Sequence, residues 1–367
     1  MYFDYNATHP ICVEIENNFK KLIESDGNPS SAHKIGRTAK DAMESVREKI
    51  ADYLGVSYKE IFFTSGGTES NVLALLGYCD KNLKSGNKIL YLGVEHPSLL
   101  GAIKNLSEKG FHCVKIAVDS NGLPDMNEFS KEVVDASFVT MMYVNNETGL
   151  IFPIDKVAKL CKENNVVFHS DCVQAFTKIK MDFTNIDLAS FSGHKIGSFK
   201  GVGFLYKKSS ISLAPLFPYS TQEKGVRGGT ENTIGINSLG IALESIFHKN
   251  KIKELRDFFE SEILKRLNNV SITCFEQNRV DNTSNINFRG CSGESLMFSL
   301  DIKNICVSLG SACAAGSITP SHVLLEMGFS DKKARSTLRF SFGRYNTKDE
   351  VVALLDILEE IVNRIKK

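Results

Sequence analysis

A glycine- and hydroxyl-rich segment, Thr64-Ser-Gly-Gly-Thr-Glu-Ser-Asn71, lies between a β-rich run and a helical pattern. Its glycines would leave backbone N–H groups free at the start of a helix, and such a site favours a phosphate. Gly67 and Thr68 are the candidates for that contact. Taken alone, the segment is more simply an ordinary helix N-cap with a glycine turn. No G-K-[ST] sequence is present, so a P-loop nucleotide site is disfavoured.

The segment Ser190-Phe-Ser-Gly-His-Lys-Ile-Gly197 encloses Lys195 between small and polar residues, and a glycine-punctuated strand follows it. A lysine in so confined a setting can have its pKa lowered enough to form a Schiff base with an aldehyde. The alternative is an exposed loop lysine, the commonest fate of this residue type. Other residues must therefore support an aldehyde cofactor before Lys195 is assigned to one.

Asp171 gives that support, because pyridoxal phosphate (PLP) needs a protonated pyridinium nitrogen and a carboxylate is the usual partner of that nitrogen. A helix N-cap explains Asp171 about equally well. Gln174, three residues further on, would hydrogen-bond the phenolic oxygen of the ring. His96 precedes Pro97 at the end of KILYLGVEH, where an imidazole would stack on the cofactor and move protons. A lone histidine is more often structural.

Short β-rich runs alternate with helical patterns between about residues 60 and 205. IFFT, KILYLG, CVKIAV, FVTMMYV and VVFHSD indicate strands, and SLLGAIKNLSEKG and IDKVAKLCKENN indicate amphipathic helices. The alternation predicts an α/β fold with a largely parallel sheet and helices on both faces. SGGTESN, VEHP, NNETG and DCVQ each follow an expected strand, at the edge where such sheets bind ligands.

After Gly235 the pattern changes to a long helical stretch reaching Leu267, followed by strands near SITCF, SNINFRG, ICVSLG and TLRFSFG. This pattern predicts a smaller α+β domain, with the N-terminal segment packed against it. We therefore expect a large domain over residues 15–245 and a small domain formed by residues 1–14 and 246–367.

The composition is that of a globular protein: 367 residues, 42% hydrophobic and 24% charged. Lys and Arg total 44 against 43 Asp and Glu, so direct nucleic-acid binding is not predicted. The nine cysteines form no C-x-x-C pair and no apolar leader opens the sequence, which favours a reduced, cytoplasmic protein. No apolar run approaches the roughly 20 residues that cross a bilayer, and no residue cluster has metal-ligand spacing.

Ten segments in order along the chain resemble the NifS-like cysteine desulfurases among class V aminotransferases, from residue 2 to about residue 345. They are DYNATHP, GNPSSAH, TSGGTESN, EHPS, NNETG, HSDCVQ, SFSGHKIG, RGGTEN, GSACAAGS and TLRFSFGR. The resemblance implies a PLP-dependent transferase of fold type I, whose large domain contains a mostly parallel seven-stranded sheet.

The resemblance also implies a role for each matching residue. Lys195 would carry the cofactor, Asp171 would contact the pyridinium nitrogen and His96 would act as the stacked acid/base. Thr230 would reach the site from the second subunit of a homodimer, and Arg339 would bind the substrate carboxylate together with Asn146. The implied cofactor-binding residues are Gly67, Thr68, Asn146, Asp171, Gln174, Ser192, Gly193, His194, Lys195 and Thr230.

Cys313 decides which reaction is expected. Small residues surround it in GSACAAGS, a composition suited to a mobile loop that carries a thiolate to a substrate. A buried, inert cysteine is the alternative. The resemblance implies that Cys313 takes sulfur from L-cysteine, which leaves L-alanine and an enzyme persulfide. The sulfur would pass to an acceptor protein for iron–sulfur cluster assembly or for thiolation of a cofactor or tRNA.

Three departures from the family pattern are visible. His9 stands where the family often has a second threonine, and Ser198-Phe199 replace a common Gly-Pro; neither removes a catalytic group. Only 28 residues (367 minus 339) follow Arg339, whereas relatives devoted to iron–sulfur scaffolds often continue further, so the sequence leaves open both the acceptor and docking to such a scaffold.

Two other functions are compatible with parts of this pattern. A class V aminotransferase or selenocysteine lyase would use the same cofactor site, and Cys313 argues against transamination because that reaction needs no thiol. A non-catalytic thiol sensor or sulfur carrier would keep the fold without the cofactor. The joint presence of Lys195, Asp171 and Thr68 argues against that second function.

Overall fold

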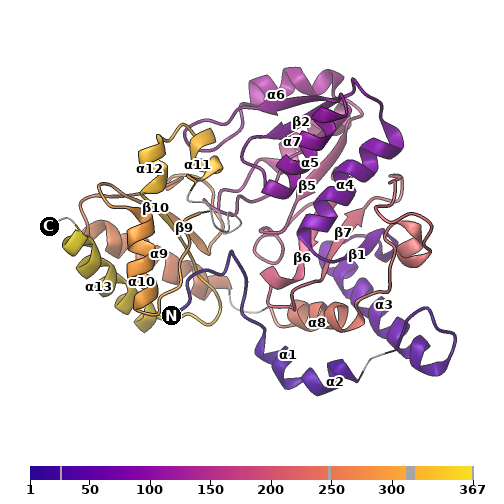
Figure 1. Ribbon diagram of the computed structural model, residues 1–367, viewed down its shortest axis with the longest axis horizontal. Coiled ribbons are helices and arrows are strands. Elements are labelled where there is room, and N and C mark those ends of the chain that lie inside the picture. Colours follow the sequence, from indigo (N-terminus) through magenta and orange to yellow (C-terminus); the bar gives the residue numbers. More distant parts are fainter. Residues whose placement is uncertain (25–26, 247–248, 311–318, 366–367) are drawn as a thin grey trace.

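The structure is a computed structural model that describes residues 1–24, 27–246, 249–310 and 319–365. Figure 1 shows two lobes joined side by side, a larger one built around a twisted sheet and a smaller one that contains the C-terminal segments in orange and yellow. The N-terminal segment runs between the two lobes. Among the described ranges, no helix is both long and apolar enough to cross a membrane.

The large lobe contains a seven-stranded sheet in the order β1-β7-β6-β5-β4-β2-β3. Only β7 is antiparallel to its neighbours, so the carboxyl ends of the other strands lie along one edge. This arrangement confirms the predicted mostly parallel sheet. The strands are β1 (Ile61–Thr64), β2 (Lys88–Leu92), β3 (His112–Ile116), β4 (Phe138–Thr140), β5 (Val167–Asp171), β6 (Leu188–Ser192) and β7 (Gly203–Lys207).

Helices cover both faces of this sheet because successive residues of each strand point to opposite sides. Phe62 of β1 packs in one apolar cluster with Leu73 and Leu99, whereas its neighbour Phe63 packs in another with Ile50 and Val157. The first face is covered by α4 (Gly67–Asn82) and α5 (Pro97–Glu108), and the second by α3 (Lys34–Leu54), α7 (Ile154–Glu163) and α8 (Thr233–Glu244).

The small lobe has a three-stranded antiparallel sheet, β10-β9-β8, formed by Thr337–Ser341, Thr283–Phe288 and Val270–Ile272. It packs against α9 (Lys249–Arg266), α10 (Gly293–Ile302) and α13 (Lys348–Ile365). Phe3 is fully buried in the same apolar cluster, so the chain's start packs here before it crosses to the large lobe. The boundaries predicted for the two domains stay a prediction.

The remaining helices are short. They are α1 (Val13–Asn17), α2 (Phe19–Ile23), α6 (Met126–Glu132), α11 (His322–Glu326) and α12 (Asp331–Arg335), with single 3-10 turns at Tyr58–Glu60, Val133–Asp135, Gly193–Lys195 and Gln222–Gly225.

Two expectations about the second half of the chain were wrong. The single long helical stretch is divided into α8 and α9, and the Ser245 carbonyl just past α8 accepts a hydrogen bond from Arg344 Nη1 at 2.7 Å. That carbonyl is therefore satisfied outside a helix. The segment ICVSLG is not a strand, because Cys306 and Ser308 make isolated bridges with different parts of the chain.

Candidate active site

A cavity of about 300 Å³ lies at the carboxyl edge of the seven-stranded sheet. The motifs predicted to meet at this edge all contribute to its lining. The predicted site residues that line it are Gly67, Thr68, His96, Asn146, Asp171, Gln174, Ser192, His194, Lys195 and Arg339.

Three predicted site residues do not line this cavity. Gly193 is buried in the turn behind Ser192, and its contact with a cofactor stays a prediction. Thr230 is exposed on the segment between β7 and α8, and within the described part of this one chain it does not reach the cavity. Cys313 lies outside the described residues.

One end of the cavity is formed by the turn between β1 and α4. No side chain caps the start of α4, whose N-cap residue is Gly66 with φ 151°. A Cβ atom on Gly203 of β7 would lie 2.6 Å from Gly66 Cα, so the two backbones pack too closely for a side chain. Gly67 and Thr68, at the start of α4, line the cavity together with Ser192, and a helix start without a side-chain cap suits an anion.

His194 lies at the same end of the cavity, where its Nδ1 is 3.1 Å from Thr8 Oγ1. Burial, together with the charges of Lys195 and Lys200, lowers the pKa of His194 to about 4. The imidazole is therefore neutral at neutral pH and can donate a single hydrogen bond to an anion.

Asp171 ends β5 and its carboxylate is held by two donors. Asn71 Nδ2 donates to Oδ2 at 2.7 Å, and the Val173 N–H donates to Oδ1 at 2.9 Å. The carboxylate is buried and faces the cavity. Asn71, from the first turns of α4, is a site residue that the sequence interpretation missed; it belongs to the SGGTESN motif but was given no role.

The amine of Lys195 donates to the Asn6 carbonyl at 2.7 Å and to the Ala7 carbonyl at 2.8 Å. Gln174 Nε2 donates to the same Asn6 oxygen at 3.0 Å. The N-terminal motif DYNATHP therefore enters the site and holds two of the predicted residues. Sequence interpretation gave Asn6 no role, although its motif was part of the family resemblance.

His96 is the N-cap of α5, and its Nδ1 accepts a hydrogen bond from the Ser98 N–H at 3.2 Å. This contact leaves the proton of the neutral ring on Nε2. Burial lowers the pKa of His96, and the nearby Asp171 charge opposes that shift only in part. The ring is therefore arranged as a proton acceptor or donor at the edge of the cavity, not as a fixed cation.

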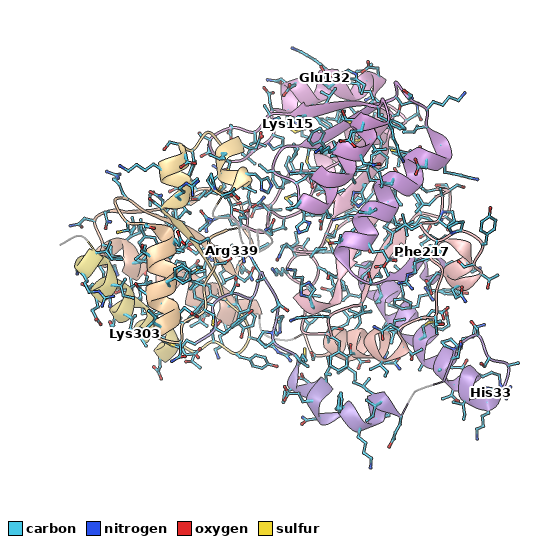
Figure 2. The ribbon with its side chains drawn as sticks, in the orientation of Figure 1. His33, Lys115, Glu132, Phe217, Lys303 and Arg339 are labelled. Carbon is cyan, nitrogen blue, oxygen red and sulfur yellow. The ribbon has the colours of Figure 1, made fainter. Side chains whose placement is uncertain are left out.

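Arg339 extends from β10 of the small lobe and lies where the two lobes meet (Figure 2). Its Nη1 donates to the carbonyls of Asn146 and Gly310, and its Nη2 pairs with Asp4 Oδ1 at 2.7 Å. Its Nε is buried without a partner among the described residues. A guanidinium N–H without a protein partner is suited to a carboxylate ligand.

These groups fit PLP. The cavity combines an amine for the aldehyde, a buried carboxylate for the ring nitrogen and an uncapped helix start with the Ser192 hydroxyl for the phosphate. Arg339 at the other side suits the carboxylate of an amino acid.

Comparison with known proteins gives the same class. The family model described as "Aminotransferase class-V" matches residues 1–354. "Cysteine desulfurase IscS" of Dictyoglomus turgidum is 38% identical, covering 100% of this chain and 95% of the relative. Among solved structures, a "NIFS-LIKE PROTEIN" has a TM-score of 0.91 at 34% identity, covering 99% of both chains. A NifS-like protein from Rickettsia africae has a TM-score of 0.89 at 33% identity, again covering 99% of both.

The chain belongs to the class V aminotransferase family, whose members are PLP-dependent. Within that family it groups with the NifS-like cysteine desulfurases, as the resemblance of its motifs implied.

Proposed function

We propose that the protein is a PLP-dependent cysteine desulfurase, which converts L-cysteine to L-alanine and leaves a persulfide on Cys313. The observation that carries the proposal is the single cavity lined by Lys195, Asp171 and Arg339. It supports a site in which a covalently held cofactor and an amino-acid carboxylate lie side by side.

PLP, when bound, supplies the electron sink that makes the Cα–H bond of an amino acid acidic. Lys195 would hold the cofactor and then move the α-proton. Arg339 would orient the substrate carboxylate through Nε and the second hydrogen of Nη2, with the Asn146 side chain beside it. His96, neutral in this environment, would exchange protons with the substrate.

The sulfur step balances without an external oxidant. The Cys313 thiolate attacks the substrate sulfur, the new S–S bond forms and the substrate Cβ–S bond breaks. Its electron pair stays with Cβ, which gains a proton and becomes the methyl group of alanine. The product on the enzyme is a persulfide that an acceptor protein can remove.

We further propose a homodimer in which Thr230 completes the phosphate site of the other subunit, as the family resemblance implies. The exposure of Thr230, of Phe217 and of Tyr219 on one segment supports this arrangement, because an exposed aromatic pair is typical of an interface. Figure 2 shows Phe217 at the outer edge of the large lobe. A Thr230→Ala dimer with unchanged PLP affinity would contradict the shared site.

Two further parts of the proposal concern the cell. We expect a cytoplasmic protein, in line with its free cysteines. The sulfur acceptor is an unidentified partner, for which an iron–sulfur scaffold is one candidate.

Borohydride reduction of the purified protein, followed by peptide mapping, tests the cofactor assignment. The label should fall on Lys195 and vanish in Lys195→Ala, while the exposed control Lys200→Ala keeps both the label and the conversion of cysteine to alanine. A label on another lysine would refute the site. Equal amounts of 3-mercaptopyruvate and aminated cofactor formed from cysteine, with no alanine, would instead indicate an aminotransferase.

A further inference from the structure

Lys178 lies outside the active-site cavity but contacts two residues that line it. Its Nζ is 2.5 Å from Gln174 Oε1 and 3.0 Å from Asn6 Oδ1. Both acceptors are uncharged amide oxygens, whereas lysines with buried amines are usually paired with carboxylates. The contacts therefore call for a reason other than charge neutralisation.

The amine of Lys178 is in an unfavourable electrostatic setting. Burial, and then repulsion by Lys195 and Arg339, lowers the pKa of Lys178 to about 7. A free lysine has a pKa near 10.4. The charge of Lys195 therefore disfavours the protonated form of Lys178.

The backbone before Lys178 is strained. Thr177 has φ 67°, a left-handed conformation that a β-branched residue rarely adopts. Strain of this kind persists where the surrounding structure requires it, commonly at functional sites. Here it accompanies the inward direction of Lys178, while Lys180, two residues later, is exposed.

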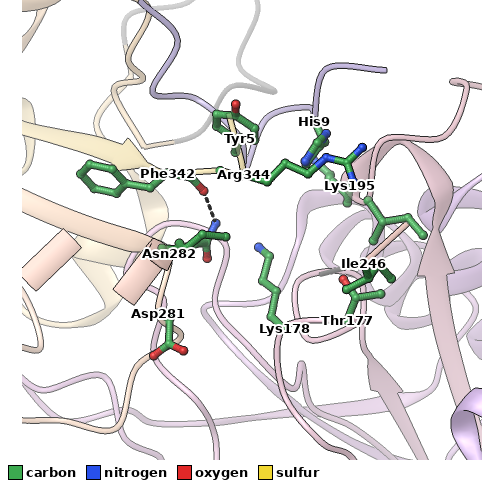
Figure 3. Close-up of a pocket in the computed structure, with 13 residues that line it drawn as sticks. Tyr5, His9, Thr177, Lys178, Lys195, Ile246, Asp281, Asn282, Phe342 and Arg344 are labelled. Carbon is green, nitrogen blue, oxygen red and sulfur yellow. Dashed lines mark hydrogen bonds between the residues drawn. The ribbon is translucent and has the colours of Figure 1, made fainter. Parts of the chain in front are cut away.

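A second cavity, of about 110 Å³, lies on the other side of Lys195 and is lined by both lysines. Figure 3 shows Lys178 extending toward Asn282, whereas the carboxylate of Asp281 points away from it. The charged or titratable groups that line this cavity with Lys178 are Tyr5, His9, Lys195, Asp281 and Arg344.

We propose that Lys178 is a positioning residue for the cofactor, which acts by fixing the orientation of the Gln174 amide. A primary amide has two N–H hydrogens and one acceptor oxygen. Because Lys178 occupies Oε1 and Asn6 O takes one hydrogen, the second hydrogen stays available to the ring oxygen of PLP. The opposite orientation would turn Oε1 toward an anionic ring oxygen. This inference rests on the proposed function, since it assumes PLP in the active-site cavity.

Lys178→Met tests the inference, because it removes the donor and the positive charge but keeps the apolar length. The visible absorption band of the bound cofactor changes with pH, and its midpoint should rise by about 1 unit in the variant. Loss of the N–H donor and loss of the nearby cation act in the same direction. PLP should also dissociate about 10-fold faster, while borohydride still places the label on Lys195.

Lys178→Arg should bring the pH midpoint most of the way back to the wild-type value, because the adjoining cavity has room for a longer cation. Lys180→Met, an exposed lysine in the same segment, is the matched control and should behave as wild type. When Gln174 is already replaced by alanine, Lys178→Met should raise the pH midpoint by less than half of the shift it causes alone, because Lys178 acts through the Gln174 amide.

An unchanged midpoint and PLP release rate in Lys178→Met, with only a lower melting temperature, would overturn the inference by showing a purely structural role. If that variant does not fold, Lys178→Gln replaces it. The pH midpoint of the absorption band should then rise by a smaller amount, and an unchanged midpoint would contradict the inference. A wild-type protein that forms no bond with PLP would instead overturn the proposed function.

Discussion

Arg339 and Asp4 form an ion pair at 2.7 Å inside the candidate site, with Arg339 itself only 1% exposed. Asp4 belongs to the first segment of the chain and Arg339 to the last strand of the small lobe. The pair fixes one end of the guanidinium, while Nε stays without a partner among the described residues. A substrate carboxylate would therefore meet a rigid donor that is already correctly oriented.

Arg339→Lys should weaken substrate binding more than cofactor binding. The lysine keeps the charge but lacks the planar pair of N–H donors. The loss of about 1.5–3 kcal/mol expected for a hydrogen bond to a charged group corresponds to a roughly 10- to 140-fold higher KM for cysteine. Steady-state kinetics, with PLP content measured in parallel, checks this. The exposed Arg335→Lys is the control, and an unchanged KM for Arg339→Lys would remove Arg339 from the substrate site.

His169 should make the protein sensitive to mild acid. It is fully buried between Thr140 Oγ1 and Ser190 Oγ, and burial lowers its pKa to about 3. Because the unfolded chain binds a proton near pH 6.5 and the folded chain does not, the free energy of unfolding falls as the pH drops below that value. Between pH 7 and pH 5 this one residue should lower the free energy of unfolding by about 2 kcal/mol.

Urea unfolding of wild type and His169→Asn at the two pH values measures this effect. The difference between pH 7 and pH 5 should be about 2 kcal/mol smaller in the variant, whereas the exposed His112→Asn should match wild type. Equal pH dependence in all three proteins would show that His169 does not contribute to acid sensitivity.

Thr177→Asn should stabilise the fold by about 1 kcal/mol, because asparagine tolerates the left-handed region that threonine avoids. The reciprocal change is available in the same chain: Asn165 has φ 59°, and Asn165→Thr should destabilise by a similar amount. Thermal unfolding of both variants checks the sign. A lower melting temperature for Thr177→Asn would mean that threonine's own contacts outweigh the backbone strain.

Site residues that directly follow a strand could be predicted from the sequence. Site residues brought together from distant segments were missed. Asp171 and His96 were found because polar residues after parallel strands must gather at one edge of the sheet. Asn6 contacts Gln174 across 168 positions of sequence, and no local pattern indicates such a contact. The end of α8 was missed for the same reason. The carbonyl just past it accepts a hydrogen bond from Arg344, 99 residues away in the sequence. The contacts Asn71–Asp171 and Lys178–Gln174 were also missed, because they depend on how the side chains are oriented in the folded protein.

The mass of the enzyme after a single exposure to cysteine, without reductant, tests the central claim most directly. Wild type should gain one sulfur atom on the peptide that contains Cys313, and release one alanine with it. Cys313→Ala should bind PLP and respond spectrally to cysteine but gain no sulfur and release almost no alanine. Cys306→Ala, which removes an exposed cysteine of the described chain, should behave as wild type. Near wild-type alanine production by Cys313→Ala, or sulfur on another peptide, would contradict the desulfurase assignment.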